Sequence, residues 1–382
     1  MAQSLLAHLE LTRQSFAAAS TLPSAVYSDP QIFGREQQRL FSQQWICVSH
    51  ISALAKPGNY FLRQVAGQSV LLVRGGDQII RAFFNVCRHR GSQLIDAAEG
   101  QGLSRIICPY HAWSYQPNGE LQLAPSMPEN FIRKDHGLIP LRCATRFGLQ
   151  FVNLSSDAPP LNACLHDMPD LSRFKVADLV SGRRIEYLVQ ANWKLLCENY
   201  SECYHCPGAH PQLHKLTELV QRSDRPMEVG RCFNGGPMRL RDGVDTMSNS
   251  GKRGLPLIPG LSADDARYVH YYVLYPNLLL SLHPDYVLLH YLWPQSAGST
   301  KVVCEWLVSP DALTKMASDL TDVVDFWDLT NRQDWALCER VQSGVVSAGY
   351  RQGPYQSAED CVHMFDRWYA DWLAAELQGE IS

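Results

Sequence analysis

Residues 87–115 read CRHRGSQLIDAAEGQGLSRIICPYHAWSY and contain two short pairs of metal-binding residues. The pairs are Cys87 with His89 and Cys108 with His111, and a polar, glycine-containing loop separates them. Thiolate and imidazole bind both zinc and iron–sulfur clusters, so the four residues alone leave two candidates. One is a structural zinc site. The other is a 2Fe-2S cluster with two cysteines on one iron and two histidines on the other, which needs one sulfur and one nitrogen from each of two turns.

Short runs rich in β-branched and aromatic residues surround these pairs from about residue 44 to 155. Gly, Pro, Asn and Asp separate the runs, a pattern that predicts a small antiparallel domain with the ligand pairs at two of its turns. Residues 155–169 have the proline and aspartate content of a linker. A second domain is therefore expected to begin near residue 161.

The sequence after the linker predicts a mixture of helices and strands. A helix is expected around 192–205, paired strands over 268–308 and a long helix from about 312 to 346. The predicted fold class is α+β, with a small antiparallel β domain at 44–160 and a larger domain of antiparallel sheet and helices at 161–382. Residues 1–43 are expected to form a helical segment that packs on the larger domain.

Composition excludes several classes of partner. The chain has 382 residues, of which 46% are hydrophobic and 19% charged, and its formal net charge of -4 gives no basic surface for nucleic acid. Residues 268–294 are strongly apolar but are interrupted by prolines, a histidine and an aspartate, so no membrane span is expected.

The N-terminus lacks the basic and apolar regions of a signal peptide, which predicts a cytoplasmic protein. In that compartment the twelve cysteines are expected to be reduced thiols or metal ligands. Cysteines outside the ligand pairs are interpreted as small buried apolar residues. They include Cys197, Cys203, Cys206 and Cys338.

A second candidate centre lies in ENYSECYHCPGAHP, residues 198–211. On a helix Glu198, Glu202 and His205 would share one stripe, and two carboxylates buried there need a nearby cation or compensating hydrogen bonds. His205 and His210 would point about 140° apart on an unbroken helix. The intervening Pro-Gly predicts a break that lets the two imidazoles converge.

Two neutral histidines and one carboxylate form the facial triad of non-haem Fe(II) oxygenases, which leaves positions open for O2 and substrate. The carboxylate is expected from another segment. In the helix predicted at the C-terminal side, Asp334 shares a stripe with apolar residues such as Trp327 and Cys338, whereas Asp328 lines up with Asn331 and Arg332 on a polar face. Because an aspartate on an apolar stripe needs a partner, Asp334 is the candidate third ligand.

Several of these stretches resemble the α subunits of the Rieske non-haem iron oxygenases (ring-hydroxylating oxygenases). CRHRG and CPYHAWSY are similar to their cluster-binding turns, NWKLLCENYSECYHCPGAHP to their iron-site helix, and QDWALCERVQSGV with EDCVHMFDRWY to their C-terminal segment. The resemblance favours a Rieske cluster over zinc. It implies that Cys87, His89, Cys108 and His111 bind a 2Fe-2S cluster, and that His205, His210 and Asp334 bind a mononuclear iron.

The same resemblance implies how electrons arrive. Glu202 occupies the place of an acid that bridges a cluster histidine and an iron-binding histidine of neighbouring subunits in a head-to-tail homotrimer. A glutamate there, instead of the usual aspartate, is similar to members that act on quaternary amines. Glu198 is a further candidate catalytic residue. A separate NAD(P)H-dependent flavin and iron–sulfur reductase would supply the electrons, because this chain shows no GxGxxG nucleotide fingerprint.

The substrate implied by the resemblance is a quaternary ammonium compound, most similar to the glycine betaine monooxygenase branch. Dimethylglycine and formaldehyde would then be the products. Proline betaine, carnitine, choline-type compounds and, within the same fold, aromatic rings are the alternatives. Aromatic faces hold such cations. The candidates are Tyr200, Tyr204, Tyr271, Tyr272, Tyr275, Tyr291 and Trp293, with Arg351 or an arginine in 221–255 for a carboxylate.

Two other classes of protein are compatible with parts of the sequence: an electron carrier and a zinc-stabilised binding protein. A non-enzymatic electron carrier would need only the Rieske domain, which leaves the second domain without a role. A zinc-stabilised binding protein would be colourless and would hold zinc at the cysteines.

Overall fold

The computed structural model describes residues 2–217, 225–315 and 320–381 of the chain. The chain divides into two compact units: residues 1–34 with 165–382, and residues 35–164. The smaller compact unit begins at Arg35, upstream of residue 44, where the small domain is expected to start. Residues 35–43 belong to this unit partly because the side-chain amide of Asn153, at the end of a strand in the smaller unit, donates to the backbone carbonyl of Gln43 at 2.8 Å.

The smaller unit is built from antiparallel strands, as predicted. A seven-stranded sheet has the order β1-β10-β9-β4-β3-β2-β5 and a three-stranded sheet the order β6-β7-β8. Their bounds are β1 Ile46–His50, β2 Tyr60–Val65, β3 Gln68–Arg74, β4 Ile80–Phe84, β5 Glu99–Gly100, β6 Ile106–Ile107, β7 Ser114–Tyr115, β8 Leu121–Leu123, β9 Pro140–Arg146 and β10 Leu149–Asn153. Short helical turns in this unit are η1 Glu36–Phe41, η2 Ile51–Leu54, η3 Arg133–His136 and α4 Leu161–Cys164.

Two-residue turns set the register of the hairpins in this unit. Ala66 and Gly67 join β2 to β3 with φ of 49° and 74°, and Phe147 and Gly148 join β9 to β10 with φ of 51° and 74°. Positive φ at both central residues is the geometry whose twist matches the flanking strands. A glycine at the second position therefore allows each pair of strands to fold back directly.

The larger unit contains one seven-stranded antiparallel sheet of order β11-β17-β16-β15-β14-β13-β12. Its strands are β11 Val180–Val189, β12 Glu228–Val229, β13 Phe233–Arg239, β14 Tyr268–Leu274, β15 Leu278–Leu282, β16 Val287–Ser296 and β17 Ser299–Val308. The paired strands expected over 268–308 are therefore confirmed. β14 and β15, the first part of β16 and the second half of β17 are buried, which explains the apolar character of this stretch.

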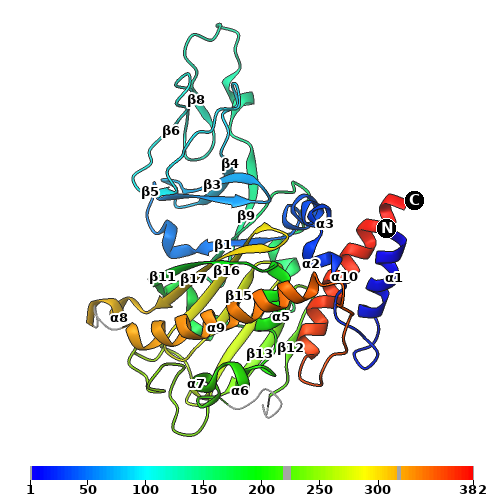
Figure 1. Ribbon diagram of the computed structural model, residues 1–382. Coiled ribbons are helices and arrows are strands. Elements are labelled where there is room, and N and C mark those ends of the chain that lie inside the picture. The colour runs from blue at the N-terminus through cyan, green and yellow to red at the C-terminus, as the bar shows by residue number, and fades with distance from the viewer. Residues whose placement is uncertain (1, 218–224, 316–319, 382) are drawn as a thin grey trace. The chain divides into compact units, whose positions relative to one another are not determined.

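Helices of the larger unit complete the α+β class. They are α1 Ala2–Thr12, α2 Ala25–Ser28, α3 Pro30–Arg35, α5 Trp193–Tyr200, α6 Cys206–Ala209, α7 Pro211–His214, α8 Pro310–Lys315, α9 Thr321–Val345 and α10 Asp360–Ile381, with 3-10 turns at Ser172–Phe174, Val176–Asp178 and Asp265–Arg267. α5 and α9 lie side by side (Figure 1), and the Cys338 thiol donates to the Leu195 carbonyl at 3.6 Å between them. No helix among the described residues is both long enough and apolar enough to cross a membrane.

The N-terminal helix packs within this larger unit. α1 runs beside α10 (Figure 1), and the Arg13 guanidinium donates to the Asp371 carboxylate at 2.6 Å. The backbone N–H of Thr21 donates to the Gly353 carbonyl at 2.9 Å. These contacts join the first residues of the chain to the segment around its last helix.

Candidate metal centres

The four residues of the first candidate centre come from two loops with the same backbone construction. In the first, the N–H of Gly91 donates to the Cys87 carbonyl at 3.1 Å, and in the second the N–H of Ala112 donates to the Cys108 carbonyl at 3.1 Å. Gly91 and Ala112 both have positive φ, 74° and 57°. The two loops therefore reverse at the same distance from their cysteines, and each can present one thiol and one imidazole.

The two sides of this centre differ in burial. The cysteines Cys87 and Cys108 are 4% and 2% exposed, whereas His89 lies at the surface with its ring 4.8 Å from that of His111. Burial opposes ionisation of the Cys108 thiol, but hydrogen bonds from backbone N–H groups, including that of His111, outweigh it and lower the pKa. The Tyr115 hydroxyl lies 3.2 Å from the Cys87 sulfur. Burial raises the pKa of the Cys87 thiol. Two buried sulfurs on one side and two imidazoles on the other fit a 2Fe-2S cluster with mixed ligands.

The helix that leads to the second centre ends earlier than the sequence predicts. Asn192 begins α5 by accepting from the Lys194 N–H at 3.0 Å, and the Ser201 N–H closes the helix on the Cys197 and Glu198 carbonyls. Glu202 and His205 lie beyond the helix. The predicted single stripe through residues 198, 202 and 205 is therefore wrong, because the backbone turns after Tyr200.

Glu202 organises this turn. Its carboxylate accepts from the backbone N–H groups of Tyr204 and His205, the latter at 3.2 Å, and also contacts His205 Nδ1. A disulfide joins Cys203 to Cys206 across the same turn, with Cα atoms 5.0 Å apart. The expectation that these two cysteines are reduced is wrong: the turn brings their Cα atoms to a separation that a disulfide spans.

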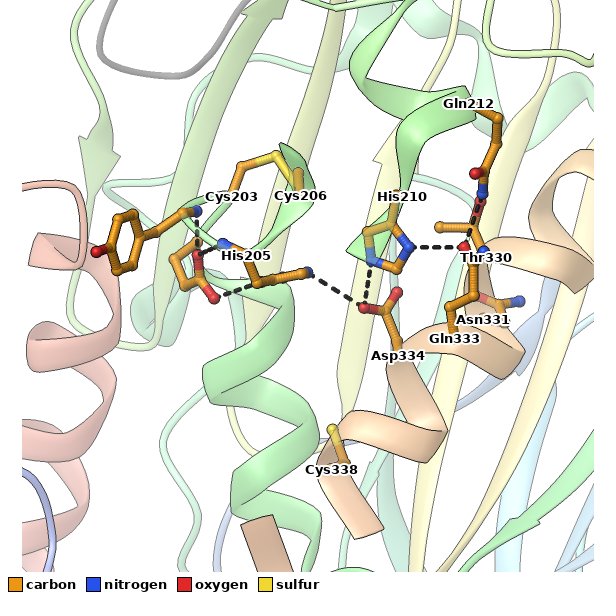
Figure 2. A network of polar contacts seen from close by, with 12 residues as sticks. Cys203, His205, Cys206, His210, Gln212, Thr330, Asn331, Gln333, Asp334 and Cys338 are labelled. Carbon is orange, nitrogen blue, oxygen red and sulfur yellow. Dashed lines mark hydrogen bonds and ion pairs between the residues drawn. A yellow bond between two sulfur atoms is a disulfide. The ribbon is translucent and has the colours of Figure 1, made fainter. Parts of the chain in front are cut away.

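The three predicted ligands of the second centre converge. One ligand atom from each of His205, His210 and Asp334 lies within 4.8 Å of the others. Asp334 Oδ1 is 3.2 Å from His205 Nε2 and 2.8 Å from His210 Nε2 (Figure 2). His210 is 1% exposed, whereas His205 and Asp334 are 19% and 16% exposed. Asp334 lies on α9, so residues far apart in sequence form one partly buried cluster.

Both imidazoles are oriented through their other nitrogen. Nδ1 of His205 contacts Glu202, and Nδ1 of His210 is 2.8 Å from Gln333 Oε1. Gln212 in turn donates to that same Gln333 oxygen at 2.7 Å (Figure 2). An Nδ1–H that donates to an oxygen leaves the Nε2 lone pair free for a metal. The donor set and its orientation therefore fit a divalent iron held by two histidines and one carboxylate.

The neighbouring α9 positions differ partly from the predicted stripes. Asp328 accepts from the Tyr187 hydroxyl at 2.7 Å and from Arg332 at 2.8 Å, as expected for a polar face. Asn331, predicted on that face, is buried and contacts His290 Nε2 at 3.0 Å. Packing against the sheet makes the buried side of α9 wider than a single apolar stripe.

A cavity opens beside the three ligands. Tyr200 and Tyr271, two of the aromatic candidates for substrate binding, line it, and Trp327 lines it as well. Trp327 precedes Asp334 by two helical turns, so its place on the same stripe was a signal that sequence reasoning did not use for the substrate. Asp360 also lines the cavity, and none of the described lining residues is lysine or arginine.

The other aromatic candidates lie outside this lining. Side chains alternate along a strand, so Tyr272 faces away from the cavity that Tyr271 lines and donates to Glu228. Tyr291 is buried and donates to Glu305 at 3.1 Å, and Tyr204 is 60% exposed. The remaining residues that the structure places outside the lining are Tyr275, which accepts from the Asn234 amide, Trp293, and Arg351, which donates to backbone carbonyls. Part of the 221–255 segment, residues 221–224, lies outside the described residues.

Glu198 is also apart from the cavity lining. Its carboxylate accepts from the Tyr27 hydroxyl at 2.8 Å and contacts Asp366 on α10. Burial raises the pKa of Glu198 to about 7 and also raises that of Asp366. Glu198 and Asp366 thus join α5 to the N-terminal segment and to α10. Glu198 therefore has a structural role here and not the catalytic role that was expected.

This acid pair predicts that stability falls as pH rises. Between about pH 4.5 and pH 7 an unfolded chain releases the Glu198 proton, while the folded chain keeps it. The folded state then binds more protons than the unfolded state. The free energy of unfolding therefore decreases as pH rises, by about 1.4 kcal/mol per unit of difference between the two pKa values. Denaturant unfolding of Glu198→Gln is expected to show a shallower decrease over this range than the wild type. Glu339→Gln is the control, and an unchanged slope in Glu198→Gln would refute the assignment.

The chain matches two families of domains. The Rieske [2Fe-2S] domain matches residues 44–143, and the ring hydroxylating alpha subunit (catalytic domain) matches residues 176–375. The glycine betaine monooxygenase oxygenase subunit of Chromohalobacter salexigens is 31% identical over 395 residues, covering 94% of this chain and 87% of the relative. The carnitine monooxygenase oxygenase subunit of Acinetobacter pittii is 30% identical over 345 residues, 87% of each protein.

Solved structures agree with these matches. A crystal structure of a quaternary ammonium Rieske monooxygenase with L-carnitine has a TM-score of 0.75 and 26% identity, covering 97% of this chain and 98% of that one. Naphthalene 1,2-dioxygenase from a Rhodococcus species has a TM-score of 0.76 at 21% identity, covering 98% of both chains, which shows the fold alone.

An antiparallel domain with two cysteine–histidine loops, followed by a sheet domain with a cluster of two histidines and one carboxylate, defines an oxygenase of the Rieske type. The chain belongs to the Rieske non-haem iron oxygenase α subunits, the ring-hydroxylating oxygenase family. The family resemblance, the fold class and the enzyme class predicted from the sequence are thus confirmed. Oxygenase subunits of this kind carry a 2Fe-2S cluster and a non-haem iron and take electrons from a separate reductase.

Proposed function

We propose that this oxygenase hydroxylates an N-methyl group of a quaternary ammonium compound, with glycine betaine as the first candidate. The supporting observation is the cavity, in which Tyr200, Tyr271 and Trp327 lie on the same lining as the candidate iron ligands and no described lysine or arginine is present. A quaternary nitrogen can neither donate nor accept a hydrogen bond, so aromatic faces are the groups that hold it, each contributing about 0.5–2 kcal/mol.

The reaction balances with one O2, two electrons and two protons. One oxygen atom enters a C–H bond of the N-methyl group, and the other leaves as water. The hydroxymethyl product then loses its O–H proton to water, its C–N bond breaks, formaldehyde leaves, and the electron pair of that bond stays on nitrogen. The two electrons come from NAD(P)H through the separate flavin and iron–sulfur reductase.

The chain's own residues have distinct tasks in this proposal. Cys87, His89, Cys108 and His111 would hold the 2Fe-2S cluster, and His205, His210 and Asp334 the mononuclear iron. When bound, that iron supplies O2 activation at its open positions. Trp327 and Tyr271 orient the methylammonium group toward this side of the cavity. Gln333 and Glu202 keep both imidazoles in the orientation that binds metal.

Glu202 is proposed to have a second task in a homotrimer. Its carboxylate contacts a ligand imidazole, and its own side chain is 12% exposed, so one edge remains available to another group. In a head-to-tail ring this edge would face the cluster histidine of a neighbouring subunit, and electrons would cross between subunits there.

The described cavity lining has acidic residues and no lysine or arginine, which favours choline-type compounds as a second candidate substrate class. A betaine carries a carboxylate as well as a cation, and a carboxylate near Asp360 is repelled unless a donor compensates. A choline-type compound has the cation and no carboxylate. Comparison of the two classes therefore tests which end of the substrate the cavity recognises.

The decisive experiment is a single turnover of the chemically reduced protein with O2. Glycine betaine, choline, carnitine, proline betaine and naphthalene are offered separately, and formaldehyde, aldehydes and cis-diols are measured while the visible cluster spectrum is followed. Formaldehyde with glycine betaine, together with cluster reoxidation, is expected. Turnover of choline alone would move the proposal to the carboxylate-free class, and a cis-diol from naphthalene without formaldehyde would overturn it.

Trp327→Leu is expected to raise the KM for the quaternary ammonium substrate by about 2- to 30-fold, which corresponds to the loss of one cation–π contact. Trp293→Leu is the matched control, because Trp293 is half-buried and lies outside the cavity lining. Steady-state formaldehyde production at varied substrate concentration gives KM and kcat for each variant. Equal changes in the two variants would exclude a specific role for the Trp327 ring.

A further inference from the structure

The disulfide between Cys203 and Cys206 encloses one of the candidate iron ligands. The two cysteines are separated by Tyr204 and His205 only. The chain's other ten cysteines, all within the described residues, are not disulfide-bonded. Figure 2 shows the bond beside His205, with His210 and Asp334 across the cluster.

The bond lies in the turn that also positions Glu202. The Glu202 carboxylate accepts from the N–H groups of Tyr204 and His205 and contacts the His205 ring, so it restrains the two residues that the disulfide encloses. Both sulfurs belong to residues that line the cavity. Any change in the bond therefore acts directly on the backbone that carries the His205 imidazole.

Global stabilisation is a poor explanation for this bond. The stabilisation from a disulfide through chain entropy grows with the length of the loop that it closes, and this loop is among the shortest possible. Two cysteines with two residues between them are instead the spacing of redox-active pairs. Cys203 and Cys206 are 7% and 4% exposed and face the cavity, so a small molecule that enters the cavity can reach them while a large one cannot.

We propose that Cys203–Cys206 is a redox-active site that controls how firmly His205 is held, an inference that rests on His205 being an iron ligand. A small-molecule dithiol reduces it: the Cys203–Cys206 S–S bond breaks, two electrons and two protons pass to the cysteines, and the reductant becomes a disulfide. O2 or hydrogen peroxide reverses the step by taking up the same two electrons and two protons, which turns O2 into hydrogen peroxide or hydrogen peroxide into two water molecules. The oxidised turn holds the imidazole in place, and the reduced turn lets it move.

Disulfide mapping is the first part of the test. Holoenzyme purified in air is denatured and alkylated without reductant, and peptides are analysed by mass spectrometry. The peptide with Cys203 and Cys206 is expected to carry an internal disulfide, and both cysteines are expected to become alkylated after dithiothreitol treatment of the native protein. Alkylation of both without reductant would overturn the proposal.

The second part follows the iron without any substrate. The nitric oxide adduct of the mononuclear iron is recorded by EPR before and after dithiothreitol, and the release of that iron to a chelator is timed. Reduction is expected to change the adduct spectrum and to speed iron release by about tenfold, the size of effect seen when support of a metal ligand is removed. Identical adduct spectra and identical iron-release rates before and after dithiothreitol would refute the proposal that this disulfide controls how His205 is held.

Variants separate this site from the other thiols. Cys203→Ser/Cys206→Ser is expected to behave like the reduced wild type and to ignore dithiothreitol, whereas Cys232→Ser, which removes a cysteine that is not disulfide-bonded, keeps the wild-type response. If the double variant does not fold, the EPR spectrum and iron release of the wild type, measured before and after dithiothreitol, still test the proposal. Failure of the substrate proposal would leave these results unchanged, because none of them involves turnover.

Discussion

Asp334→Ala is expected to lose the mononuclear iron and nearly all turnover while keeping the visible Rieske spectrum. The variant removes the carboxylate that lies 2.8 Å and 3.2 Å from the two imidazoles, and two histidines alone hold iron weakly. Iron content should fall from about three to about two atoms per subunit. Turnover should fall by more than about 100-fold, since changes to residues that merely support a ligand already cost about 10- to 100-fold.

The matched control for this variant is on the same helix. Asp328→Ala removes a carboxylate of the same size, one that accepts from Tyr187 and Arg332 and takes no part in the cluster. It should keep about three iron atoms per subunit and most of the activity. If Asp334→Ala retained the third iron, or if both variants lost it equally, Asp334 would not be the ligand.

The second large effect is expected from Glu202→Gln. The change keeps the size of the side chain but removes the negative charge that polarises the His205 ring and accepts from two backbone N–H groups. Both metal centres should remain, because none of their ligands is altered. Steady-state turnover is nevertheless expected to fall by about 10- to 100-fold, since electrons would reach the mononuclear iron slowly.

Stopped-flow spectroscopy locates this defect. The prereduced cluster of Glu202→Gln should be reoxidised slowly in the presence of O2 and substrate, in proportion to the loss of turnover. Glu228→Gln, which alters a carboxylate that contacts Tyr272 elsewhere in the larger unit, is the control. A normal reoxidation rate in Glu202→Gln would remove the electron-bridging role, and loss of the iron would reassign Glu202 to ligand support alone.

The ligand loops illustrate what local sequence can predict. Cysteine and histidine alternate over a few residues, and the chemistry of those residue types limits the metal centre to two candidates before any fold is known. The buried strands from Tyr268 to Val308 were similarly predictable, because apolar runs between turn residues report burial along one continuous segment.

The iron-site turn shows where periodicity failed. A helical repeat assumes that the helix continues, and nothing in that repeat announces that α5 ends at Tyr200. The Glu202 carboxylate and the Cys203–Cys206 disulfide decide the path after that residue, and both act through three-dimensional contacts. The sequence interpretation therefore placed the right residues in this segment but predicted the wrong geometry for them.

Sequence alone determined which residues can bind metal, the antiparallel character of both domains and the family, because residue chemistry and short-range patterns carry that information. Tertiary structure alone decided that Tyr271 faces the cavity while Tyr291 packs elsewhere, that Trp327 joins the lining, and that Glu198 pairs with Asp366. These outcomes depend on contacts between segments that lie far apart along the chain. Such contacts arise only when the sheet and its helices pack together.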